Sequence, residues 1–306
     1  MKRRTFVAGV AASGASAALA ASGLAQESAG TATPAAEASA STPQRGYAPV
    51  NGLQMYYEIH GEGEPLVLVH GAFGAVDQWG SILSTLAADH QVIAVDLQGH
   101  GRTADIDRPF TYDAFADDVA GLMDHLGVAH ADVVGYSMGA TIVLRFAMRH
   151  PARVRKLVVI SGGYRQDGSY PDVLASIQEI TPDVFAGTPI EEAYLRNAAN
   201  PEDFPALVDK ASVLVATDFA WSEADVRAIA APTLLIYADS DNFRLEHMVE
   251  LFRLLGRGMP GDLTGLPKSQ LAIIPGATHV GLVVDRTHLW LPMVTEFLDE
   301  PLPEAG

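Results

Sequence analysis

The sequence predicts an α/β fold: a mostly parallel sheet with helices on both faces and a helical cap inserted between two strands. Short apolar runs of strand length recur along the chain and alternate with segments of helical periodicity. The alternation stops once, between residues 162 and 231, where prolines and aromatic residues occur without a clear strand. A chain of 306 residues with 48% hydrophobic content can bury the large core that such a fold needs.

The strands are predicted from their apolar runs. The first forms a hairpin with the segment before it, turning at Asn51-Gly52, a favoured hairpin turn. The predicted strands are residues 53–59, 66–70, 91–96, 132–137, 156–161, 233–239 and 271–275. All but the hairpin strand are compact runs of the kind that buried parallel strands show.

Helices are predicted between most of these strands. The clearest patterns cover residues 82–88, 111–126 and 140–150. A last helix is expected at about residues 288–298, with Thr287 as its N-cap and Pro292 close enough to its start to be tolerated.

The N-terminus has the composition of an export signal. Residues 1–25 start with Lys2, Arg3 and Arg4 and continue through a mildly apolar run, which predicts cleavage before Gln26. The arginine pair favours the twin-arginine pathway, with an ordinary secretory signal or an uncleaved anchor as the alternatives. We therefore expect a periplasmic or secreted protein.

The rest of the chain divides into a linker and three parts of one fold. Residues 26–45 are mostly Ala, Ser, Thr and Pro, which predicts a disordered linker. The core is expected to cover residues 46–161 and 232–306, with the cap at residues 162–231.

Composition excludes several classes of function. The formal charge of −17 argues against nucleic acid or an anionic membrane surface as a partner. The sequence contains no cysteine, so disulfides, a thiol nucleophile and thiolate metal ligands are excluded. No histidine pair has the spacing of a zinc-binding helix, and no segment after the signal is apolar enough to span a bilayer. We expect no metal site and no membrane insertion after signal cleavage; the sequence leaves the oligomeric state open.

The residues with the strongest chemical implication are 135–139, which read Gly-Tyr-Ser-Met-Gly between a predicted strand and a predicted helix. This arrangement is a nucleophile elbow, in which a strained tight turn holds the serine hydroxyl clear of the backbone. Ser137 is therefore the candidate nucleophile. A tight turn without chemistry is the alternative, because a hydroxyl needs a base and an oxyanion site to react.

The candidate base is His279. It lies in the loop after the last predicted strand, so it shares the carboxyl edge of the sheet with Ser137. An acid is needed to orient the imidazole, and Asp239 and Asp241 both lie at the end of the strand before it. Alternation along the strand sends both side chains in similar directions and does not separate them.

Two backbone N–H groups are expected to form the oxyanion hole. Met138 follows the serine at a helix N-terminus and supplies one. The second comes from the glycine-containing turn at residues 70–74, with Ala72 as first choice and Phe73 as second. Each donor contributes roughly 3 kcal/mol in the transition state.

Substrate contacts are expected from residues around this site and from the cap. The cap aromatic residues are Tyr164, Tyr170, Phe185, Tyr194, Phe204, Phe219 and Trp221. We select Phe185 and Trp221, together with Tyr136 and Phe73 beside the serine, as candidate substrate-binding residues. Packing inside the cap is the alternative for each cap residue.

From about residue 46 to residue 300 the chain resembles the α/β-hydrolase fold superfamily. The resemblance rests on His70-Gly71, on residues 96–101, on the elbow around Ser137, and on the chain order serine, acid, histidine. Family members often carry Gly-x-x-Asp at the acid loop, with the last residue catalytic. That spacing favours Asp241, although Ala238 stands in place of the glycine.

The resemblance implies acyl transfer without a cofactor. Ser137 is expected to attack a carbonyl, His279 to transfer the proton and Asp241 to orient the imidazole. A small or medium apolar carboxylic ester or lactone is the expected substrate, because the cap is rich in aromatic residues and no basic cluster stands out. A carbon–carbon bond hydrolase or a perhydrolase is the alternative within this fold, and a non-catalytic ligand receptor is the alternative outside catalysis.

Overall fold

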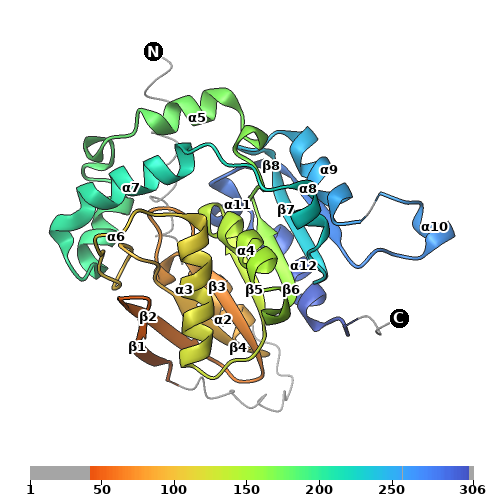
Figure 1. The fold of residues 1–306 in the computed structure, drawn as a ribbon, viewed down its shortest axis with the longest axis horizontal. Coiled ribbons are helices and arrows are strands. Elements are labelled where there is room, and N and C mark those ends of the chain that lie inside the picture. Colours follow the sequence, from red (N-terminus) through yellow and green to blue (C-terminus); the bar gives the residue numbers. More distant parts are fainter. Residues whose placement is uncertain (1–41, 257, 303–306) are drawn as a thin grey trace, which may run out of the picture.

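The computed structural model describes residues 42–256 and 258–302. They form one eight-stranded sheet with the strand order β1-β2-β4-β3-β5-β6-β7-β8, covered by helices on both faces (Figure 1). The predicted α/β class is confirmed. The predicted export signal and most of the predicted linker lie outside the described residues.

The strands agree with the apolar runs to within a few residues. They are β1 Gln44–Val50, β2 Leu53–His60, β3 Glu64–Val69, β4 His90–Val95, β5 Ala131–Tyr136, β6 Val154–Ile160, β7 Thr233–Ser240 and β8 Gln270–Thr278. The pairs β1–β2 and β2–β4 are antiparallel and the other pairs are parallel. Because β1 begins at Gln44, the last two residues of the predicted linker belong to the sheet.

The helices fall into a core set and a cap set. The core helices are α2 Gly80–Leu86, α3 Tyr112–His125, α4 Met138–Arg149, α9 Leu245–Leu254, α11 Gly281–Val284 and α12 Thr287–Asp299. The short helix α10 Gly261–Thr264 buries no residue and projects away from them (Figure 1). The cap and the segment after it contain α5 Pro171–Gln178, α6 Pro189–Asn197, α7 Phe204–Ala216 and α8 Glu223–Arg227. The 3-10 helices are η1 Val76–Trp79, η2 Pro151–Arg153, η3 Gln166–Gly168, η4 Pro182–Phe185 and η5 Pro201–Asp203.

The sheet separates two hydrophobic cores. Alternate residues of each central strand point to opposite faces, so Val133 packs with α3 and α4 whereas Val134 packs with α2 and α12. Trp79 and Trp290 are the largest side chains of the second core and are almost fully buried. The arrangement fixes the strands, and therefore the loops that follow them, from both sides.

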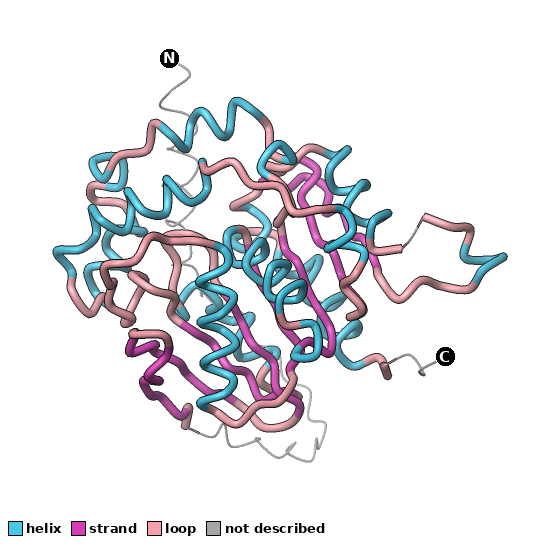
Figure 2. The backbone as a smooth tube through the Cα atoms, in the orientation of Figure 1, coloured by secondary structure: helices cyan, strands magenta, loops and turns pink. Residues whose placement is uncertain are grey.

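The cap lies beyond the carboxyl edge of the sheet, where α5, α6 and α7 form a layer of helices and loops (Figures 1 and 2). Its own core contains Phe185, Tyr194 and Phe204, all buried. Ionic contacts join it to the sheet loops, among them Lys210 Nζ to Asp105 Oδ2 at 2.5 Å. The expected helical insertion is therefore present.

The predicted cap of the last helix is wrong. Helix α12 begins at Thr287 itself, and the residue before it, Arg286, makes no side-chain capping bond. The Thr287 hydroxyl donates to the Val283 carbonyl at 3.1 Å instead, because the short helix α11 ends directly before α12. None of the helices in residues 42–256 and 258–302 has the length and apolar character needed to cross a membrane.

Candidate active site

β5 and β6 end level with one another, and β7 continues beyond them to Ser240. Tyr136 pairs with Ile160, and Ile160 pairs with Ile236. The next N–H group continues this ladder, since Ser137 N donates to the Ile160 carbonyl at 2.9 Å. The side chains that follow these strands are thus brought to one edge of the sheet, as expected for a parallel sheet.

Ser137 lies between β5 and α4 in the left-handed region, with φ 56° and ψ −118°. The turn brings the start of α4 against the end of β3. A Cβ atom on Gly139 would lie 2.2 Å from the Val69 carbonyl oxygen, so only glycine fits there. Residues 135–139 therefore form the strained strand-to-helix turn that the sequence predicts.

His279 joins Ser137 to a carboxylate. Its Nε2 atom lies 2.8 Å from Ser137 Oγ, and its Nδ1 atom lies 2.9 Å from Asp241 Oδ1. The histidine follows β8 and precedes α11, and its side chain is 12% exposed. Beneath it, the Tyr136 hydroxyl donates to the His279 carbonyl at 3.0 Å. The order of groups is the one that activates an oxygen nucleophile.

Asp241 is buried and receives hydrogen bonds on both oxygens. Oδ1 accepts from His279 and from Asn242 N at 2.7 Å. Oδ2 accepts from Ala238 N at 3.0 Å and from the Ser161 hydroxyl. Burial alone would raise the pKa of Asp241, but the adjacent imidazole and these hydrogen bonds hold the pKa below its usual range. The carboxylate is ionised at neutral pH.

Asp239, the other candidate acid, has a different role. It is exposed and accepts hydrogen bonds from Gly276 N at 2.9 Å and Ala277 N at 3.2 Å. It therefore braces the loop that leads to His279. The pairing of β7 with β8 shifts between Ala238 and Ser240, so simple strand alternation does not hold beyond Ala238.

The turn after β3 lies against the serine, as the oxyanion-hole prediction requires. A Cβ atom on Gly71 would lie 3.3 Å from Ser137 Cβ. The Gly71 N–H is already bound by Gln78 Oε1 at 2.9 Å, which leaves Ala72 and Phe73 as the candidates from this turn. Met138 opens α4, and the N–H groups of a first helical turn have no acceptor within the helix.

His70 fixes the shape of that turn. Its Nδ1–H donates to the Gly71 carbonyl at 2.8 Å, and its Nε2 accepts from Leu97 N at 3.1 Å. Burial lowers the pKa of His70, which agrees with a neutral ring that donates through one nitrogen and accepts through the other. The histidine supports the loops after β3 and β4.

The four candidate substrate-binding residues do not share one location. Phe73 and Phe185 meet with ring centroids 4.9 Å apart, which connects the turn after β3 to the cap. Tyr136 is buried under His279 and supports it. Trp221 packs against Tyr112, at 5.8 Å, as well as Phe219 and Arg145. Those contacts place Trp221 between the cap segment and α3–α4, where it is partly exposed.

Sequence reasoning missed two residues beside this site, Gln78 and Ser161. Gln78 holds the Gly71 N–H, and Ser161 donates to the carboxylate of Asp241. Ser161 had one recognisable feature, since it follows its strand directly, as Ser137 does. Nothing in the local sequence indicates Gln78, which reaches its partner from η1.

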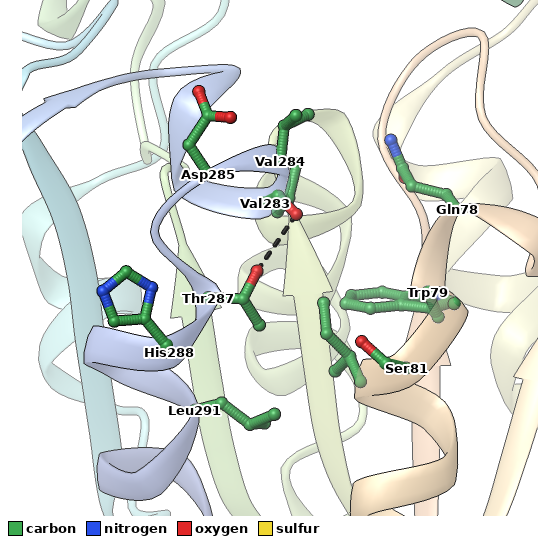
Figure 3. A pocket seen from close by; sticks show the side chains of 11 residues that line it. Gln78, Trp79, Ser81, Val283, Val284, Asp285, Thr287, His288 and Leu291 are labelled. Atoms are coloured by element: carbon green, nitrogen blue, oxygen red, sulfur yellow. Dashed lines mark hydrogen bonds between the residues drawn. The ribbon is translucent and has the colours of Figure 1, made fainter. Parts of the chain in front are cut away.

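A cavity of about 460 Å³ lies between the start of α2 and the α11–α12 segment (Figure 3). Its lining includes Gln78, Trp79, Asp285 and His288, and it includes neither Ser137 nor His279. Gln78 connects it with the turn after β3, because its Oε1 atom accepts from the Gly71 N–H. The cavity therefore lies on the α2–α12 side of the sheet, separate from the serine.

Comparison with known proteins agrees with this architecture. The sequence profile of the alpha/beta hydrolase fold matches residues 64–215. The chain belongs to the α/β-hydrolase fold superfamily. The enol-lactonase from Burkholderia xenovorans LB400 superposes with a TM-score of 0.62 at 23% identity, covering 83% of this chain and 100% of that one.

The sequence relatives include proteins that are named as hydrolases. "Putative carbamate hydrolase RutD" of Azorhizobium caulinodans is 38% identical over 40% of this α/β hydrolase and 46% of its own length. The 2-hydroxymuconate semialdehyde hydrolase of a Pseudomonas species is 29% identical over 62% of this chain and 75% of its own. The chain thus matches less than half the length of RutD.

Proposed function

We propose that this α/β hydrolase is a serine hydrolase that cleaves a small or medium apolar carboxylic ester or lactone through an acyl-enzyme on Ser137. The observation that carries the proposal is the continuous hydrogen-bonded chain from Ser137 through His279 to Asp241. Each contact is within hydrogen-bonding distance before any substrate is bound, so little rearrangement is needed to activate the hydroxyl.

Acylation follows from the positions of these groups. Ser137 Oγ attacks the carbonyl carbon while His279 Nε2 takes its proton. Asp241 Oδ1 holds the Nδ1–H and stabilises the imidazolium that forms. The N–H groups of Met138 and Ala72 donate hydrogen bonds to the carbonyl oxygen as it becomes negatively charged, with Phe73 as the alternative to Ala72. His279 then gives its proton to the departing alkoxide, and the alcohol leaves.

Deacylation repeats the sequence with water. His279 takes a proton from the water that attacks the acyl carbon, and the proton returns to Ser137 when the acid is released. In a lactone the leaving alcohol stays attached to the acyl group, so ring opening yields a single hydroxy acid. The scheme uses this chain's residues and water, and we propose that it requires no cofactor.

An apolar substrate is proposed because the aromatic pair Phe73–Phe185 stands beside the turn after β3. The similarity to an enol-lactonase supports the proposal that a lactone is a substrate. Cleavage of a carbon–carbon bond is the second candidate, favoured by the relative named 2-hydroxymuconate semialdehyde hydrolase, which is matched over 75% of its length.

The test is release of p-nitrophenol from acyl esters of increasing chain length, with a panel of lactones in parallel. Ser137→Ala should lower kcat by about 10³-fold or more. Ser84→Ala is the matched control, because that hydroxyl is exposed and bonds only its own helix, to the Ser81 carbonyl. An active Ser137→Ala variant, or wild type inactive on all esters and lactones, would overturn the proposal. If the wild type is inactive, the leading hypotheses become cleavage of a carbon–carbon bond and a non-catalytic ligand receptor.

We also propose that the protein is exported to the periplasm or secreted, on the composition of residues 1–25. A fusion of residues 1–45 to a reporter should leave the cytoplasm. Replacing Arg3 and Arg4 by lysine should block transport if the twin-arginine pathway is used. Retention of the unaltered fusion in the cytoplasm would contradict export.

A further inference from the structure

Ser161 occupies the same position after β6 that Ser137 occupies after β5. Its N–H donates to the Ile236 carbonyl of the next strand at 2.8 Å, and its φ is 57°. Unlike Ser137 it is completely buried. A residue other than glycine costs about 1–2 kcal/mol in this left-handed conformation, so the turn holds a strained residue that water and substrate do not reach.

The hydroxyl of Ser161 points at the carboxylate that His279 uses. It donates to Asp241 Oδ2, while His279 binds Oδ1. Without Ser161, Oδ2 would keep only the Ala238 N–H, at 3.0 Å. A carboxylate held by donors on both oxygens cannot rotate about its Cβ–Cγ bond without losing one of them. The hydroxyl thus fixes the plane of Asp241 toward His279.

The turn itself is fixed by its neighbours. A Cβ atom on Gly162 would lie 2.6 Å from Ala140 Cβ and 2.8 Å from the Ala140 carbonyl carbon, so the chain packs tightly on α4. The Tyr237 hydroxyl donates to the Gly162 carbonyl at 2.5 Å. These contacts keep Ser161 in its left-handed conformation, in line with the rule that local strain persists where the surroundings over-determine it.

We infer that Ser161 is a positioning residue that holds Asp241 in the orientation and ionisation state that His279 requires. The inference rests on the proposed serine chemistry and extends it by one residue. Ser161 does not touch substrate. It acts through Asp241, and its contribution is to kcat and to the pH dependence of activity rather than to binding.

The expected pH effect has a definite sign. The ionisable groups that face Asp241 are His279, Tyr136 and Tyr237, and burial and the Asp241 charge raise the pKa of both tyrosines, which stay neutral. Removing the Ser161 donor leaves the carboxylate more basic, which favours the protonated form of Asp241. The acidic limb of kcat/KM should therefore move to higher pH, by roughly 0.5–1 unit.

Two substitutions separate the hydroxyl from the backbone. Ser161→Ala removes the hydroxyl and keeps the strained Cβ, whereas Ser161→Gly removes both. If the hydroxyl matters, each variant lowers kcat by roughly 10–100-fold, leaves KM within about threefold, and shifts the acidic limb. Ser212→Ala is the control, because Ser212 is also buried and, within the described residues, its hydroxyl has no hydrogen-bond partner.

Glycine is the residue best suited to a φ of 57°, so Ser161→Gly keeps the test open even if the alanine variant folds poorly. A Ser161→Gly variant with wild-type kcat and pH profile would overturn the inference and leave the turn a purely structural role. If the wild type hydrolyses no ester or lactone, the proposed function fails separately. The Nδ1 proton resonance of His279, compared between wild type and Ser161→Gly, then tests the positioning role without substrate, and an unchanged resonance would refute it.

Discussion

The two turns that follow β5 and β6 each hold a serine with a positive φ, and they have opposite surroundings. Ser137 and Ser161 have φ values of 56° and 57°, and the N–H of each donates to the carbonyl of the neighbouring strand. After Ser137 the chain enters α4 at once, and the serine is partly exposed. After Ser161 come two glycines and the cap, and the serine is buried.

The difference shows that the strained turn delivers a hydroxyl to the sheet edge, and that access then decides what the hydroxyl does. Ser137 contacts the His279 imidazole and is partly exposed. Ser161 contacts the Asp241 carboxylate and is completely buried. A strained serine is therefore not by itself evidence of a nucleophile, because its partner and its exposure must be known as well.

The largest expected effect comes from a substitution of Asp241, to which both turns are connected. Asp241 is bound by Ser161 directly and reaches Ser137 through His279. Asp241→Asn should lower kcat by about 10⁴-fold, because an amide does not hold the tautomer that leaves Nε2 free to accept a proton. Steady-state hydrolysis of an ester substrate measures this loss of kcat. Asp239→Asn is the control and should cost less than about tenfold, since that side chain only braces backbone. Equal losses in both variants would contradict this assignment.

A smaller effect, on the free energy of unfolding, should appear at acidic pH and involves only the surroundings of the turn after β6. His247 lies behind that turn, stacked on Tyr164 and Phe243 at 5.1 and 5.7 Å. Among the described residues neither of its ring nitrogens has a hydrogen-bond partner. Burial, aided by Arg165 and Arg244 and opposed by Glu250 and Asp167, lowers the pKa of His247 from 6.5 to about 4.

The sign follows from proton binding. Between pH 6.5 and about 4 the unfolded chain binds a proton at His247 that the folded chain does not, so the free energy of unfolding falls as pH falls through this window. The loss approaches about 3 kcal/mol at pH 4. His247→Phe should flatten this slope in urea unfolding at several pH values, whereas His288→Phe, at an exposed site, should leave it unchanged. An unaltered slope in His247→Phe would show that the histidine is already charged.

The smallest effect tests whether the two turns are equally strained. At each position the glycine variant should be more stable than the alanine variant, by roughly 1 kcal/mol, because glycine relieves the left-handed conformation. Thermal unfolding should show a Tm difference of about 2 °C for both pairs. Unequal differences at positions 137 and 161 would mean that one turn relaxes when its side chain is removed.

Much of this architecture could be predicted because it depends on local patterns. Apolar runs located the strands. Ser137 at the end of one predicted strand and His279 in the loop after the last one were therefore expected at the same edge. The choice between Asp239 and Asp241 could not be made from alternation, because the strand pairing shifts at this point. The role of Ser161 depends on a contact across 80 residues of sequence, which no local pattern contains.

The cap residues were hardest to predict for a related reason. An aromatic residue in an insertion can line a pocket or fill a core, and the sequence is the same in both cases. Phe185 is buried in the core of the cap and its ring meets Phe73 beside the turn after β3, whereas Trp221 is partly exposed and packs on Tyr112. Only the tertiary arrangement separates the two outcomes.

The order of the strands also sets when this site can form during folding. The hydrogen bond between Ser137 and His279 closes a separation of 142 residues. Asp241 and His279 directly follow β7 and β8, and both strands come after the whole cap. Such long-range contacts form late, and during synthesis they await the last part of the chain. A chain released only as far as the cap has the strained serine but no imidazole beside it. In the proposed mechanism Ser137 therefore stays unreactive until β8 has joined the sheet, and loss of β8 from the sheet edge would remove its base again.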